Sequence, residues 1–139
     1  MAFKHGKDFA FLSAASDLSA FCDGIEWSRS RDTSESTTAG AAEDTKTYVA
    51  GQRDNSFTIS GKFDSTASTG PRAVLNGDID SDASVSYTIR QEGTGSSLPQ
   101  NIVSAFCTGY SESIPVGGVV TFSASFQCTG AVNETAQSA

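Results

Sequence analysis

The stretch RDTSESTTAGAAEDTKTYVAGQRDNSFTISGKFD, residues 31–64, has two halves of opposite character. Up to residue 47 it is polar and almost without large side chains, so this half cannot build a core of its own. In the second half apolar and polar residues alternate, as in Phe57, Thr58, Ile59 and Ser60. Alternation of this kind is typical of a half-buried β-strand. The stretch therefore predicts a long polar segment attached to a firm strand.

The same alternation recurs along the chain and predicts an all-β class with six or seven strands. It is seen in the segments 8–14, 24–32, 84–91 and 118–130. In the second of these, Ile25 and Trp27 form one row, which Arg29 and Arg31 continue toward water. The segment 101–110 has apolar residues in both rows, which predicts a central strand covered on both faces.

One short helix is expected in this β-rich chain. The segment STGPRAVLNGD has Ser68 or Thr69 as N-cap, Pro71 in the first turn and Gly77 as the stop. The length predicts a single domain over residues 1–139. Within it we expect residues 33–47 to form an extended arm or loop and residues 131–139 a loose polar tail.

The charge is strongly acidic, at −7 from 16 acidic and 9 basic residues. Beyond Gly77 the chain has six carboxylates and a single base, Arg90. Such a chain should not hold DNA by neutralising phosphates, although it can lie beside DNA as a repelling wall. Three widely spaced cysteines, Cys22, Cys107 and Cys128, are expected to be reduced thiols.

The residues predict no catalytic, metal or cofactor site, and hence no enzyme. The only histidine, His5, lacks a nearby carboxylate in sequence. The segment DIDSD, residues 78–82, begins like a calcium loop, but Ala83 and Ile89 stand where that loop needs Gly and Glu. We expect a solvated acidic turn there. No signal peptide or membrane span is visible in the sequence.

Two glycines stand where a side chain is expected to be unwelcome. Gly51 lies at a predicted turn, and Gly61 lies inside the alternating strand, on the row of Phe57 and Ile59. A missing side chain on an inward row predicts the close approach of another element to Gly61.

The segment 31–64 resembles the signature region of tail tube proteins, the major tail proteins of long-tailed bacteriophages. Polar and small residues carry the first part of the likeness: Asp32, Thr33, Ser34, Glu35, Thr37, Gly40, Lys46, Tyr48 and Gly51. Gly61, Phe63 and Asp64 carry the second part, at the end of the alternating strand. The resemblance implies assembly roles for the first set, Ser34 apart, and structural roles for the second.

The resemblance further implies two packed antiparallel sheets, as in a β-sandwich or barrel, with the hairpin between Trp27 and Phe63 as an assembly arm. It implies six subunits in a ring, rings stacked into a tail tube, and passage of DNA through the lumen for delivery to the host. The implied partners are further copies of the chain, the tape measure, the tail terminator and the baseplate or tip, with no membrane. The implied place is the virion tail, assembled in the bacterial cytoplasm. A head–tail connector, a capsid decoration protein and a carbohydrate-binding β-sandwich remain as alternatives.

Overall fold

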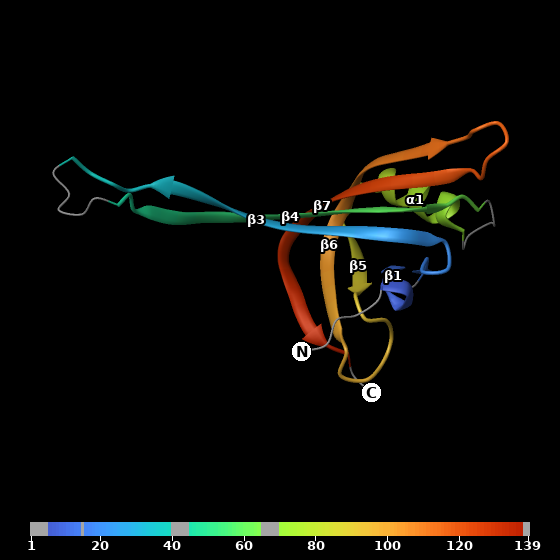
Figure 1. Ribbon diagram of the computed structural model, residues 1–139, viewed down its shortest axis with the longest axis horizontal. Coiled ribbons are helices and arrows are strands. Elements are labelled where there is room, and N and C mark those ends of the chain that lie inside the picture. The colour runs from blue at the N-terminus through green and yellow to red at the C-terminus, as the bar shows by residue number, and fades with distance from the viewer. Residues whose placement is uncertain (1–5, 15, 40–44, 65–69, 138–139) are drawn as a thin grey trace.

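A computed structural model describes residues 6–14, 16–39, 45–64 and 70–137 of the chain. Within these ranges a 3-10 helix (Gly6–Asp8) precedes seven strands and one α-helix, α1 (Pro71–Ile79). The strands are β1 (Ala10–Ser13), β2 (Ser16–Asp17), β3 (Cys22–Glu35), β4 (Tyr48–Lys62), β5 (Val85–Arg90), β6 (Pro99–Ser113) and β7 (Thr121–Ala136). The all-β class with one short helix is therefore confirmed (Figure 1).

The seven strands form one antiparallel sheet in the order β2-β1-β5-β6-β7-β4-β3. The expectation of two separate sheets is wrong in this respect. Two facing layers exist nonetheless, because the sheet curls back on itself. Phe11 of β1 lies four places from β4 in the order, yet its ring centroid is 5.9 Å from that of Phe57. Strand twist accumulated over seven strands produces this curl.

The core fills the inside of the curled sheet. It is built around four aromatic side chains that contact one another, Phe11, Phe57, Tyr87 and Phe126, with centroids 4.6 Å apart for the stacked pair Phe57–Phe126. The described part of β6 buries alternate residues and exposes Ser104, Phe106 and Thr108 between them. The prediction that this strand is covered on both faces is therefore wrong, because only the inner face meets the core.

Helix α1 packs on this core through Leu75, which is fully buried. It begins at Pro71 after Gly70, which makes no side-chain cap, and it continues through Gly77 to Ile79. The predicted caps Ser68 and Thr69 lie outside the described residues, and the predicted stop at Gly77 is wrong. A helical glycine costs about 1 kcal/mol, which tertiary contacts can offset.

One such contact is made by Asp78, in the last turn of α1. Its Oδ2 accepts hydrogen bonds from Ser13 Oγ at 2.8 Å and from Tyr87 OH at 2.9 Å, so it ties the helix to β1 and β5. Both donors are buried. Of the predicted acidic turn, Asp80 and Asp82 are exposed as expected, but Asp78 is not a solvated residue.

The C-terminal segment is ordered by its partner strand. Strand β7 runs to Ala136, which pairs with Pro99, so the predicted loose tail over 131–139 is wrong for residues 131–136. Gln137 is buried and its Nε2 donates to the Gly93 carbonyl at 2.7 Å. The long ladder to β6 gives the polar residues of this segment backbone partners, which their side chains alone do not predict. The last two residues, 138 and 139, lie outside the described part.

Candidate functional site

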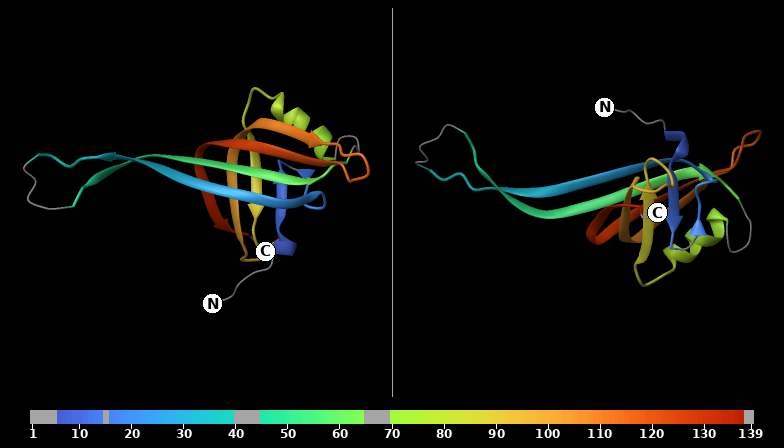
Figure 2. Two further views of the ribbon diagram at one scale, coloured as in Figure 1. Left: turned by 45° about the horizontal axis from the view of Figure 1, so that its top comes forward. Right: turned by 90° about the horizontal axis from the view of Figure 1, so that it is seen from below.

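The outer parts of β3 and β4 leave the body of the molecule together. Strand β4 pairs with β7 only from Ser56 to Lys62, whereas its pairing with β3 continues out to Tyr48. From Tyr48 up to Asn55, β4 pairs with β3 alone, so this part of the hairpin is a two-stranded ribbon. Figures 1 and 2 show it projecting far from the body in every view. We call residues 28–39 and 45–54 the protruding hairpin; all of them are exposed.

Backbone and hydroxyl contacts hold the protruding hairpin beyond the ends of its strands. Ser36 N–H donates to the Thr47 carbonyl at 2.8 Å, and Thr47 N–H donates to Thr37 Oγ1 at 2.7 Å. No core residue stabilises this ladder among the described positions. A lone two-stranded hairpin is at best marginally stable in water. The protruding hairpin therefore adds little to the stability of the single chain.

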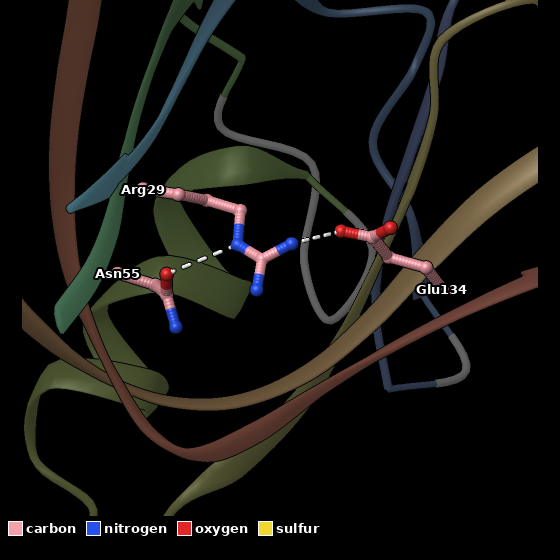
Figure 3. A network of polar contacts seen from close by, with 3 residues as sticks. All are labelled: Arg29, Asn55 and Glu134. Atoms are coloured by element: carbon pink, nitrogen blue, oxygen red, sulfur yellow. Dashed lines mark hydrogen bonds and ion pairs between the residues drawn. The ribbon is translucent and has the colours of Figure 1, made fainter. Parts of the chain in front are cut away.

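Polar contacts fix the base of the protruding hairpin to β7. Arg29 pairs with Glu134 of β7, and its Nε donates to Asn55 Oδ1 at 3.3 Å (Figure 3). Gln127 of β7 donates through Nε2 to the Asn55 carbonyl at 3.1 Å. Asn55 is buried, whereas the Arg29–Glu134 ion pair is exposed and worth at most about 1 kcal/mol. These contacts orient the hairpin more than they stabilise the fold.

The assembly residues predicted from the sequence lie on this hairpin wherever the structure describes them. Asp32, Thr33 and Glu35 lie on β3, Tyr48 and Gly51 lie on β4, and Thr37 and Lys46 lie between these strands. Gly40 falls outside the described residues. The register brings Glu35 opposite Tyr48. Tyr48 and Val49, neighbours at the outer end of β4, are each 58% exposed.

A bulge interrupts β4 of the hairpin, opposite Asp32. The register shifts between the pairs Arg31–Arg53 and Thr33–Ala50, so Gly51 and Gln52 of β4 lie opposite the single residue Asp32 of β3. A Cβ at Gly51 would lie 3.0 Å from the Asp32 carbonyl oxygen. Gly51 therefore serves close approach to β3, inside strand β4, where the sequence predicted a turn.

The residues predicted to be structural lie at the opposite end of β4. Gly61 pairs with β3 and β7 and is buried. Phe63 N–H donates to the Val120 carbonyl at 2.9 Å, and Asp64 follows it, half-buried. The anchoring residues Asn55, Gln127 and Glu134 were missed by the sequence reasoning. In the sequence they do not differ from other polar residues. Their contacts join segments more than seventy residues apart, which no local pattern predicts.

Neither a metal-binding cluster nor a membrane-spanning helix occurs within the described ranges. They contain no group of three metal-ligating side chains, and their single α-helix is too short and too polar to cross a membrane. The most prominent feature of the surface is the protruding hairpin (Figure 1).

No protein-family model matches the sequence, and no curated protein sequence matches it either. Solved structures do match the fold over nearly the whole chain. A chain in the virion of a native gene transfer agent particle superimposes with a TM-score of 0.81 at 15% identity, covering 96% of this chain and 100% of that one. A chain in the C6-symmetric tail of an empty gene transfer agent particle gives 0.76 at 17% identity, covering 96% and 100%.

The SPP1 tail tube provides a third match, with a TM-score of 0.75 at 12% identity, covering 97% of this chain and 80% of that chain. This chain therefore has the fold of tail tube proteins, as the sequence resemblance predicted. At these identities the likeness establishes the fold alone.

Proposed function

We propose that this chain is a structural protein of a virion tail: six copies form a ring, and stacked rings form a tube through which DNA passes to the host. The observation that carries the proposal is the protruding hairpin. It is well formed and anchored, yet it buries none of its own residues from 28 to 39 and from 45 to 54.

The backbone of the protruding hairpin supports this role. Strand β3 is the last strand of the sheet, and β4 has no second neighbour beyond Ser56, so both outer edges of the ribbon are open. Open strand edges are templates for pairing with another chain. In a stacked ring each hairpin would reach a neighbouring copy and have its edges and exposed side chains covered there. Asp32, Thr33, Glu35, Thr37, Gly40, Lys46, Tyr48 and Gly51 are the proposed interface residues.

The remaining parts of the proposal follow from the tube. The C6 symmetry of the gene transfer agent tail that this chain resembles supports a six-membered ring. A closed ring formed by head-to-tail contacts is the usual outcome when the rotation between subunits closes. Further proposed partners are a tape measure protein inside the tube, a terminator at one end and a baseplate or tip at the other. The chain would act without catalysis, and tubes would assemble in the bacterial cytoplasm.

Sedimentation velocity of the purified chain at increasing concentration tests the proposal. A tube protein passes from monomer to rings and then to polydisperse polymers as concentration rises. A head–tail connector or a terminator stops at one closed ring, and a sugar-binding module stays monomeric. A single species of fixed size over the whole range would contradict the tube.

A further inference from the structure

One face of the protruding hairpin is basic. The row that begins with Ile25 and Trp27 in the core continues outward on the same side of β3 as Arg29 and Arg31. Arg53 of β4 lies directly opposite Arg31 in the ladder. The opposite side of the same segment carries Asp54, which faces Ser30. Three of the nine bases of an acidic chain thus gather on one narrow surface.

Arg29 is neutralised within the chain, but the two outer arginines are not. Arg29 pairs with Glu134 (Figure 3), whereas Arg31 donates only to the Gly51 carbonyl, at 3.1 Å. Among the residues that the structure describes, neither Arg31 nor Arg53 forms an ion pair, and both are exposed. Like charges placed directly opposite each other across two strands are destabilising. The isolated chain therefore carries an unfavourable pair at this place.

We infer that Arg31 and Arg53 form a docking surface for carboxylates on the body of a second copy of this chain; the inference rests on the proposed function. Charge complementarity selects this partner. The chain carries a net −7, and beyond Gly77 its body has six carboxylates against one base, Arg90. Arg29 already shows the contact on a smaller scale, because it takes a carboxylate from β7. Arg31 and Arg53 lie further out on the ribbon. There, carboxylates on the body of a second copy can pair with them as Glu134 pairs with Arg29.

DNA is another polyanion whose charge is complementary to this surface, and the charge balance of the chain argues against it. Tight binding to DNA requires several phosphates to be neutralised at once. Here two arginines stand on a narrow ribbon with Asp54 on its other side, in a chain whose overall charge repels phosphate. A second copy also carries −7, but docking places the basic hairpin directly against the acidic body, where close charge pairs favour this orientation.

Charge reversal at Arg53 tests the inference against a matched control. Arg53→Glu and Arg72→Glu each take the net charge from −7 to −9, and both residues are exposed, Arg72 on α1. At one fixed ionic strength, we expect Arg53→Glu to raise the protein concentration needed for half-maximal polymerisation at least about tenfold. Arg72→Glu and the conservative Arg53→Lys should stay within about twofold of the original chain.

Thermal unfolding of the monomer provides a second readout. The variant that polymerises less is expected to have a monomer that is equally stable or more stable. Because Arg53→Glu places opposite charges across the ladder from Arg31, the isolated variant should unfold at the same temperature or a higher one. Loss of polymers with an intact monomer is thus the expected result. If wild type and Arg53→Glu polymerise equally, the inference fails while the proposed function stands. If the wild type forms no polymer, the proposed function itself fails.

A short fluorescent DNA duplex separates the two kinds of partner. We expect the wild-type chain to leave the fluorescence anisotropy of the duplex unchanged at physiological ionic strength. Duplex binding that Arg53→Glu abolishes would overturn the inference in favour of a nucleic-acid surface.

Discussion

The backbone of Gly61 in β4 touches that of Phe21, just before β3: a Cβ placed on Gly61 would lie 2.0 Å from the Phe21 carbonyl oxygen. That carbonyl accepts a hydrogen bond from Lys62 N–H at 2.8 Å, so it cannot move away without losing the bond. Because Gly61 has no side chain, the backbone before β3 can approach β4 closely enough for the long β3–β4 ladder to begin there. The close approach predicted for Gly61 from the sequence is confirmed.

We predict that Gly61→Val destabilises the fold by at least about 3 kcal/mol, because backbone atoms cannot give way as a flexible side chain does. Ser60→Val is the matched control. Ser60 is exposed on the neighbouring position, where a β-branched residue suits a strand, and its change should stay within about 0.5 kcal/mol. Urea unfolding of both variants measures the difference, and equal midpoints would count against the close contact.

Asp78 provides a second stability test. Asp78→Ala removes the acceptor of Ser13 Oγ and Tyr87 OH and leaves two buried hydroxyl groups without it. We expect a loss of about 2 to 3 kcal/mol in the free energy of unfolding. Asp82→Ala, an exposed carboxylate in the same acidic segment, should cost less than about 0.5 kcal/mol. Similar losses for the two variants would show that Asp78 does not tie α1 to the sheet.

The stability should also fall at alkaline pH through Cys22. Burial, and next the nearby carboxylates of Asp23 and Asp17, raise the pKa of the Cys22 thiol from 9.0 to about 12. Between these two values the unfolded chain holds fewer protons than the folded one, so the free energy of unfolding decreases as pH rises. Below about pH 9 the contribution is complete.

Urea unfolding at about pH 8 and at about pH 10.5 measures this dependence. The original chain should lose more stability between the two values than Cys22→Ala does. The other two thiols, Cys107 and Cys128, are free and present in both proteins, so their raised pKa values cancel in the comparison. If both proteins lose the same free energy of unfolding between these pH values, the pKa of Cys22 is not raised in the folded chain.

The face of β4 and β7 turned away from the core is nearly uncharged. Ser56, Thr58 and Ser60 lie opposite Gln127, Ser125 and Ser123 along the ladder. If this face lines the tube, DNA meets hydroxyl groups there. Uncharged groups do not neutralise phosphates or release counterions from DNA, so they do not bind it tightly. We predict that tubes of Ser125→Arg retain duplex DNA at physiological salt, whereas wild-type tubes and Ser125→Asn tubes do not. Equal retention by all three tubes would place this face away from the lumen.

Much of the fold could be predicted because periodicity reports which side of a strand meets the core. The inward rows through Phe57 and Ile59, and through Trp27 toward Arg29, lie as expected. Periodicity does not report which strand is the neighbour. One curled sheet and two packed sheets bury the same rows, so the alternation could not separate them. Residues 131–136 form a strand because β6 offers a long edge, and their own composition carries no trace of it.

The position of the candidate site was predictable, but its geometry was not. A polar segment without core residues, between two firm strands, marks an element that leaves the body. The bulge in β4 opposite Asp32 and the opposition of Arg31 and Arg53 depend on the register, and one residue of slip would change both. The anchor formed by Asn55 and Gln127 joins distant segments, and no local pattern announces such a contact.

Deleting Ser36 to Asp44 separates folding from assembly. All buried residues of the described chain lie outside this segment, so the variant should keep the thermal unfolding temperature of the monomer within a few degrees. It should nevertheless fail to form polymers that pellet in the ultracentrifuge, because the tip of the protruding hairpin is gone. Normal polymers from the deletion variant would remove the hairpin from the assembly interface.

Electron microscopy of the purified full-length chain at high concentration is the most direct test of the central claim that this fold assembles through its hairpin. We predict hollow tubes whose end-on class averages show six-fold symmetry, with the hairpin density of each subunit reaching a copy in the adjacent ring. Monomers at every concentration, or tubes in which the hairpin points into solvent, would contradict that claim.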